Sequence, residues 1–239
     1  MSATFRKHDA HVPDDFFVVE AAGLDWLRQA NAVAVPRVVS VGRDHIELER
    51  IEHGSWTRAA DERFGRELAV LHRTGAPSFG GENRAYIGPL PMPNEPASDW
   101  SAFYGTQRIE PFLRGVPPAL RSPIEHVLSR IDELAGPPEP PARIHGDLWR
   151  GNVLADRSET PWLIDPAAHG GHRETDLAMM RLFGGFGEVC FAAYDEVFPL
   201  NDGWRDRIAL HQLHPLLVHC VLFGGSYVEQ ALAVARRYK

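Results

Sequence analysis

The sequence predicts an α+β protein with a small lobe that contains a β-sheet and a larger lobe that is mostly helical. Two observations support this prediction. Strand-like runs are concentrated in the first fifty residues, where apolar and polar side chains alternate, as they do from His45 to Ile51. From about residue 60 onward, apolar residues recur mainly at helical spacing, interrupted at residues 145–165 by polar stretches between short apolar runs.

The small lobe is expected to hold three strands and one helix. Thr4 to Lys7 is predicted to form a short strand, and residues 14–29 are predicted to form a helix packed on one face. Residues 33–41 and 45–51 are predicted to pair as a hairpin, because a Gly-Arg-Asp turn separates them. Gly54 loosens the chain after the hairpin, so we place the lobe boundary there. The two expected units are residues 1–53 and 54–239.

The large lobe is expected to consist of helices joined by loops. Ser122 to Glu125 is predicted to start a helix, with Ser at the cap, Pro at the first position and Glu at the third. Phe79 to Pro96 is rich in Gly, Pro and Asn and is predicted to be a long loop. Pro215 is expected to kink or break a helix. Further helical segments are predicted over residues 60–75, 99–113, 124–134, 175–183 and 189–239.

Length and composition are those of an ordinary globular protein. With 239 residues and 44% hydrophobic content, the chain can bury a substantial core. It has no run of 18 apolar residues, and its first residues lack the apolar segment of a signal peptide, so we expect a cytoplasmic protein without a membrane span. Cys190 and Cys220 are expected to be free, buried thiols. The formal net charge of -7 argues against nucleic acid as a partner.

The polar stretch from His145 to Asn152 has the spacing of a phosphotransferase catalytic loop. Asp147 lies two residues after His145 and five before Asn152, and Asp165 follows the next strand-like runs. In that register the first Asp accepts a hydroxyl proton, while the Asn and the second Asp hold magnesium against nucleotide phosphates. Carboxylate and amide oxygens suit magnesium, which prefers hard oxygen ligands. Each residue alone is equally consistent with a turn or a buried histidine, but the combined order and spacing favour catalysis.

Two segments carry a family resemblance. HGDLWRGN (145–152) and LIDPAAHGGHRETDLAMMRLFGGF (163–186) resemble the fructosamine kinase (ketoamine kinase) family, within the aminoglycoside phosphotransferase and protein-kinase-like superfamily. Similar segments on both sides extend the resemblance over nearly the whole chain. It implies a protein-kinase-like two-lobe fold and an ATP- and Mg²⁺-dependent kinase. Such an enzyme phosphorylates a sugar hydroxyl of ketoamine adducts on small amines or protein lysines, which repairs glycation.

The resemblance also implies a role for individual residues. Asp147 would be the catalytic base, and Asn152 and Asp165 the magnesium ligands. Lys7 and Glu20 would clamp the nucleotide, and backbone groups of Glu49 and Ile51 would contact adenine. The acceptor side would include Trp149, His172, Arg173 and Glu174.

Several of these residues could instead have a purely structural role. Lys7 and Glu20 could simply be solvated surface residues, and Trp149 a core residue under the loop. Residues 172–174 could instead hold their own loop, and Asp176 could cap a helix or brace the catalytic loop. A zinc site at His211, His214 and His219 lacks a matching carboxylate or cysteine.

The N-terminus departs from the family pattern. No glycine-rich stretch that could cover the ATP phosphates precedes Lys7. We therefore expect either a start further upstream or a truncated paralogue with an exposed sheet edge. Two alternative functions remain open: another small-molecule kinase of the aminoglycoside or choline kinase-like group, and a catalytically silent binding protein with this fold. The oligomeric state is expected to be a monomer or a weak dimer.

Overall fold

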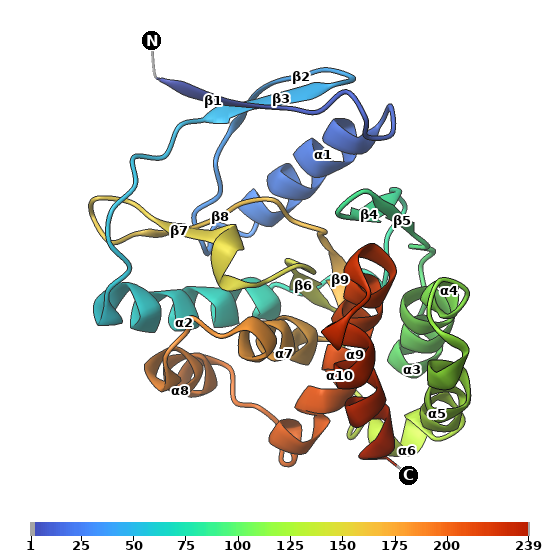
Figure 1. Cartoon of the computed structure of the whole chain (residues 1–239). Helices are drawn as coiled ribbons and strands as arrows, with labels where there is room; N and C mark the ends of the chain where they lie inside the picture. Colours follow the sequence, from blue (N-terminus) through green and yellow to red (C-terminus); the bar gives the residue numbers. More distant parts are fainter. Residues whose placement is uncertain (1–2, 239) are drawn as a thin grey trace.

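The computed structural model describes residues 3–238 and has an antiparallel three-stranded sheet at one end (Figure 1). The strand order is β1-β3-β2, with β1 at Thr4–His8, β2 at Val38–Val41 and β3 at His45–Glu49. Lys7 lies opposite Ile46 in the central strand. Helix α1, Phe16–Arg28, packs its apolar side beneath this sheet. The three strands and the helix expected for the small lobe are therefore present. β1 is one residue longer than predicted, whereas β2 and β3 are shorter.

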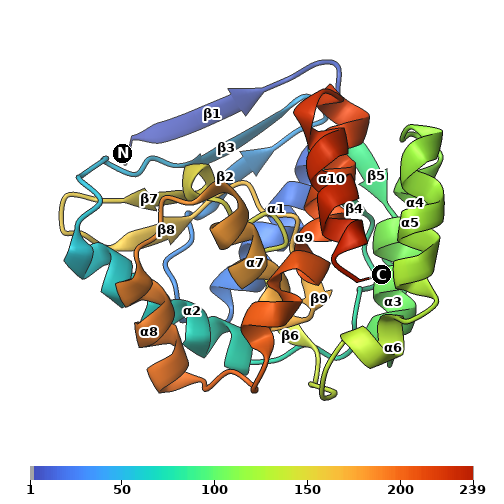
Figure 2. The same cartoon turned by 60° about the horizontal axis from the view of Figure 1, so that its bottom comes forward.

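Helices dominate the remainder of the chain, so the predicted α+β class is confirmed. In Figures 1 and 2, α2, α7 and α8 group on one side, α3 to α6 gather on the other, and α9 with α10 lies between. Short two-stranded pairs β4-β5, β6-β9 and β7-β8 connect them. The helical bounds are α2 Arg58–Arg73, α3 Trp100–Phe103, η1 Tyr104–Ile109, α4 Glu110–Leu113, α5 Pro118–Leu128, α6 Ile131–Leu134, η2 Arg150–Asn152, α7 Arg173–Phe183, α8 Glu188–Val197, α9 Trp204–Phe223 and α10 Ser226–Arg236. The remaining strands are β4 Ala85–Ile87, β5 Leu90–Met92, β6 Ala142–Ile144, β7 Val153–Ala155, β8 Pro161–Leu163 and β9 His169–Gly171.

Two hydrophobic clusters form the core. One joins α1, β3, α2, α7 and α8, with Phe17, Phe64 and Tyr194 among its fully buried side chains. The other joins the α3–α5 region to α9 and α10, around Phe103 and Leu213. The first cluster contains side chains from both sides of the predicted boundary at residues 53/54, so the core does not separate the two lobes. The division at that boundary stays a prediction. Its outer limits, residues 1, 2 and 239, lie outside the described residues.

Several predicted elements differ from the structure. Residues 33–37 are not part of the hairpin strand, because Pro36 lacks an N–H and Ala34 instead forms a bridge with Trp162. The long loop from residue 79 contains the hairpin β4-β5. The helix predicted to start at Ser122 begins at Pro118, because Pro117 and Pro118 already provide an entry with fixed φ, so Ser122 and Pro123 lie inside it.

Other helices also differ in continuity from the prediction. The segment predicted as one helix over 99–113 contains a π-helical stretch at Tyr104–Ile109. Helix α9 runs through Pro215 without a break from Trp204 to Phe223, because tertiary packing outweighs the single missing hydrogen bond. No helix between residues 3 and 238 has the length and apolar character needed to cross a membrane.

Candidate active site

Asp176 positions the loop that follows strand β6. Its carboxylate accepts hydrogen bonds from the backbone N–H of His145 at 2.7 Å and of Gly146 at 2.9 Å, and from the His72 ring at 3.2 Å. Burial alone would raise the pKa of Asp176, but the hydrogen bonds and the nearby His72 and His145 outweigh it and lower that pKa. The carboxylate is therefore a buried anchor, and it braces the loop in addition to lying in the first turn of α7.

His145 links this loop to the strand that leads to Asp165. Its Nε2 lies 2.9 Å from the carbonyl oxygen of Ile164, and its Nδ1 accepts the backbone N–H of Asp147 at 3.2 Å. Gly146 has φ +81°, and a Cβ there would overlap the carbonyl of Ala167. Only glycine allows both that conformation and that close approach. The two polar stretches are thereby held side by side.

Asp147, Asn152 and Asp165 converge at one place. The Asn152 amide nitrogen donates to the Asp147 carbonyl at 2.8 Å and to its carboxylate at 3.0 Å, and lies 3.5 Å from the Asp165 carbonyl. Since the amide nitrogen faces Asp147, the amide oxygen remains for another partner. Asp165 has φ +52°, a conformation that Asp adopts more readily than most residues.

Lys7 and Glu20 meet Asp165 across the lobes. The Lys7 ammonium lies 2.9 Å from the Glu20 carboxylate and 3.2 Å from that of Asp165. Burial would lower the pKa of Lys7, but the two carboxylates outweigh it and raise that pKa, so the ammonium keeps its charge. A lysine held between two carboxylates is placed to meet an anion that approaches the same cavity.

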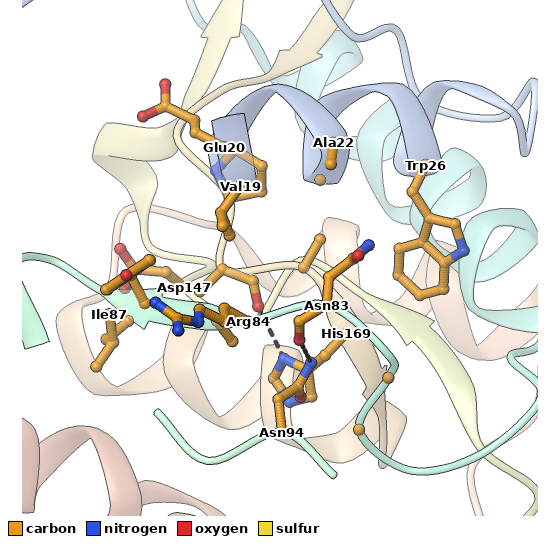
Figure 3. Close-up of a pocket in the computed structure, with 18 of the residues that line it drawn as sticks. Val19, Glu20, Ala22, Trp26, Asn83, Arg84, Ile87, Asn94, Asp147 and His169 are labelled. Carbon is orange, nitrogen blue, oxygen red and sulfur yellow. Dashed lines mark hydrogen bonds between the residues drawn. The ribbon is translucent and has the colours of Figure 1, made fainter. Parts of the chain in front are cut away.

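These residues line a cavity of about 690 Å³ between α1 and the segment that carries β4 and β5 (Figure 3). Lys7, Glu20, Asp147, Asn152 and Asp165 all contribute to its wall. Figure 3 shows α1 along one side, with Glu20 toward one end and Trp26 toward the other. The facing wall includes Asn83, Arg84, Tyr86, Ile87, Asn94 and His169.

The environment of Asp147 suits a proton acceptor. Burial raises the pKa of its carboxyl, an effect only partly offset by His145, by the Asn152 hydrogen bond and by His219. A carboxylate with a raised pKa is a stronger base than one in water. The group lies at the cavity wall, where a substrate hydroxyl can reach it.

Trp149 is exposed beside Asp147. Its side chain is 43% exposed, its indole makes an edge contact with Phe183, and it contributes to the cavity wall. Gly151 lies directly beneath the ring, and a Cβ there would overlap it. The structure therefore does not bury Trp149 as a core residue under the loop.

His172, Arg173 and Glu174 do not line the cavity. They are buried, and each makes contacts that hold the polypeptide before α7. His172 caps the helix by accepting the Glu174 N–H, Arg173 pairs with Glu139 at 2.6 Å, and Glu174 pairs with Arg207 at 2.6 Å. The expected contact with the acceptor is corrected here, because these side chains are already satisfied inside the protein.

Among residues 3–238, one group of side chains has ligand atoms close enough together to hold a metal ion. It joins His172 and Glu174 to His211 on α9. Ligand atoms of His172, Glu174 and His211 lie within 4.8 Å of one another. Both Glu174 oxygens, however, accept from Arg207, at 2.6 and 2.9 Å. A cation there would face a guanidinium that already neutralises the carboxylate, so the group is a buried ion-pair network.

Glu49 and Ile51, expected at the adenine, lie outside the cavity lining. The Glu49 N–H donates to the Arg37 carbonyl and its side chain pairs with Arg37 at 3.2 Å. Within residues 3–238 the Ile51 N–H has no backbone partner.

Sequence reasoning placed a functional loop near residues 89–94, by family resemblance, but it did not single out His219 or the earlier part of that segment. Asn83, Arg84 and Tyr86 lie in a stretch whose Gly, Pro and Asn content indicated a loop. His219 lines a small second cavity with Asp147, and its position on α9 brings it there from 72 residues away in the chain. No local motif marks such long-range neighbours.

Comparison with known proteins places this geometry among kinases. A family model described as fructosamine kinase matches residues 2–238. A protein of Enterococcus faecium named as a probable ketoamine kinase is 36% identical over 240 residues, covering 95% of this chain and 84% of its own. A crystal structure from Thermobifida fusca, provisionally named fructosamine-3-kinase, has 48% identity and a TM-score of 0.92 over 98% of this chain and 85% of its own. A choline kinase from Streptococcus pneumoniae, 14% identical with a TM-score of 0.66 over 98% of this chain and 85% of its own, shares the fold.

Proposed function

Because the chain belongs to the fructosamine kinase family, and is thus a phosphotransferase acting on a sugar-derived alcohol group, we propose that it transfers the γ-phosphoryl group of ATP to a ketoamine. The ketoamine is a sugar joined through its first carbon to an amine of a small molecule or of a protein lysine. Phosphorylating its sugar hydroxyl destabilises the adduct, so the proposed role is the repair of glycation.

The convergence of Lys7, Asn152 and Asp165 beside Asp147 is the observation that supports this proposal most strongly. The Lys7 ammonium and the oxygen donors of Asn152 and Asp165 lie near the Asp147 carboxylate, which would act as the base. The Asp165 carboxylate and the Asn152 amide oxygen fit Mg²⁺, which prefers oxygen ligands and keeps several waters. When bound, Mg²⁺ would neutralise phosphate charge as the phosphoryl group leaves the nucleotide.

Asp147 would accept the proton of the attacking sugar hydroxyl. Asn152 holds that carboxylate through its amide nitrogen, so the base is oriented before the acceptor arrives. Lys7, fixed by Glu20, would meet the phosphate oxygens and keep them in place. Positioning and charge stabilisation of this kind account for most of the rate enhancement in phosphoryl transfer.

The ends of the two substrates would lie on opposite sides of Asp147. We assign the adenine to the segment that follows β3, where the Ile51 N–H has no backbone partner among residues 3–238 and the Glu49 carbonyl lies two residues before it. We assign the sugar to the face of Trp149, whose ring suits the C–H face of a sugar. His172, Arg173 and Glu174 would act indirectly, by fixing the start of α7.

An acceptor screen tests the proposed function. Purified protein with Mg-ATP is expected to form ADP and a phosphosugar when a fructosyl-amine is supplied, and to leave choline and an aminoglycoside unchanged. The phosphosugar is identified by mass. Turnover of choline or the aminoglycoside without turnover of the fructosyl-amine would contradict the proposed acceptor while leaving a kinase.

A further inference from the structure

Five aromatic side chains form a continuous row on the surface beside the active site. This aromatic strip consists of Trp149, Phe183, His219, Phe223 and Tyr227. Ring centroids lie 6.4 Å apart for Trp149 and Phe183, and 5.0 Å apart for Phe183 and His219. His219 continues the row to Phe223 at 5.5 Å and to Tyr227 at 4.8 Å. The catalytic loop, α7, α9 and α10 each supply part of it.

The aromatic strip starts at the proposed base and leads outward to solvent. Trp149 shares the main cavity with Asp147, and His219 shares the second cavity with it. At the outer end the Phe223 side chain is 69% exposed, and Phe183 between them is 37% exposed. Adjacent large apolar side chains left in water are costly, and where they adjoin a site they commonly bind a ligand.

None of the protein's own cations in residues 3–238 lies over a ring of the strip. Nine Lys or Arg contacts with aromatic rings occur among residues 3–238, on rings such as Trp56, Phe191 and Phe198. None of these contacts involves a ring of the aromatic strip. Among the described residues the protein therefore places its own cations on other aromatic rings, so a cation that contacts the strip has to come from a ligand.

A ketoamine differs from a free sugar in one chemical respect that matches these faces. Its nitrogen is a secondary amine, which carries a positive charge at neutral pH, and it continues into an alkyl chain when the amine is a lysine. Aromatic rings attract such a cation through their negative faces and pack against the chain through apolar contact. The Asp147 carboxylate near the start of the strip adds the same sign of attraction.

We infer that the aromatic strip binds the amine half of the acceptor, a secondary ammonium on an alkyl chain, and so selects amine-linked sugars over neutral ones. The inference rests on the proposed function, because it assumes that the sugar half lies at Trp149. It goes beyond that function by assigning Phe183 to the ammonium, and Phe223 and Tyr227 to the alkyl chain.

Two matched acceptors test the inference. One is fructose carrying a pentylamino group at C1, and the other is the ether in which oxygen replaces that nitrogen. The ratio of kcat/KM for amine over ether is expected to exceed 1 in the wild type. The nitrogen lies one bond from the sugar at Trp149, so the strip ring nearest to it is that of Phe183, 6.4 Å from Trp149. The ratio is expected to fall about 2- to 5-fold in Phe183→Ala, the range for one cation–π contact at an exposed site. Phe183→Leu should lower the ratio similarly, while Phe183→Trp should keep it. Val70→Ala, at another exposed apolar position on α2, is the control and should leave it unchanged.

Calorimetric binding of the same two compounds separates failure of the inference from failure of the proposed function. Wild-type binding of the amine without turnover would contradict the proposed function, and weaker amine binding in Phe183→Ala would still support the role of the aromatic strip. An amine-to-ether ratio equal in the wild type, Phe183→Ala and Phe183→Leu would overturn the inference even if the kinase is active. No binding of the amine at all would overturn both.

Discussion

Replacing Asp176 with Asn tests whether the catalytic loop is held by a buried carboxylate. In the wild type the two oxygens accept from the His145 N–H, the Gly146 N–H and His72. An Asn side chain has one oxygen, so its NH₂ must face one of these donors and leave it without an acceptor. The lost charge-assisted bond costs about 1.5–3 kcal/mol and the unsatisfied donor about 1–3 kcal/mol, so we expect about 3–5 kcal/mol of lost stability.

Urea unfolding followed by tryptophan fluorescence measures that loss. Asp99→Asn is the matched control, because Asp99 also accepts a backbone N–H, that of Ala102 at 2.8 Å, but at an exposed helix cap. Asn caps a helix as well as Asp does, so the control should change stability by less than about 0.5 kcal/mol. A loss below about 1 kcal/mol in Asp176→Asn would refute the reasoning, since the loop would then be held by other contacts.

Three further outcomes are expected. Burial alone would raise the pKa of Glu174, but the Arg207 hydrogen bonds and the nearby His211 outweigh it and lower that pKa from 4.5 to about 2. Wild-type stability should therefore fall by about 3 kcal/mol as the pH drops from above 4.5 toward 2, and Glu174→Gln should lack that slope in acid unfolding curves. Because His219 lowers the pKa of Asp147, His219→Gln should move the acid limb of the kcat/KM profile to higher pH; an unmoved limb would count against Asp147 as the titrating base. Lys7→Met should reduce kcat/KM for ATP at least about 10²-fold in steady-state kinetics, and a smaller effect would show that the phosphates lie elsewhere.

The catalytic side of the site could be predicted from the sequence because it is built locally. His145, Asp147 and Asn152 lie within eight residues, and Asp165 follows on the next pair of short strands. Spacing alone therefore brings the three carboxylate and amide groups near one another. The approach of Lys7 to Asp165, 158 positions away, followed only from the family resemblance.

The acceptor side could not be predicted because burial and long-range pairing decide it. His172, Arg173 and Glu174 form a polar triplet in a recognisable motif, which indicated a substrate contact. Arg173 and Glu174 are instead neutralised by Glu139 and Arg207, each more than thirty positions away. No periodicity in the sequence marks those partners.

The hairpin β4-β5 was missed for a related reason. Its strands have three residues each, and Gly88 and Pro91 within the segment weaken the alternation that identifies strands. The pairing of Ala85 with Met92 is stabilised by the buried cluster beneath it, which only the folded chain brings together.

The most direct test of the whole account is single-turnover phosphoryl transfer by Asp147→Asn, with Mg-ATP affinity measured on the same protein. The account predicts that transfer to the fructosyl-amine slows by about 10²–10⁴-fold, the usual contribution of a positioned base, while ATP affinity changes little. Transfer at the wild-type rate would contradict the assignment of Asp147 as the base.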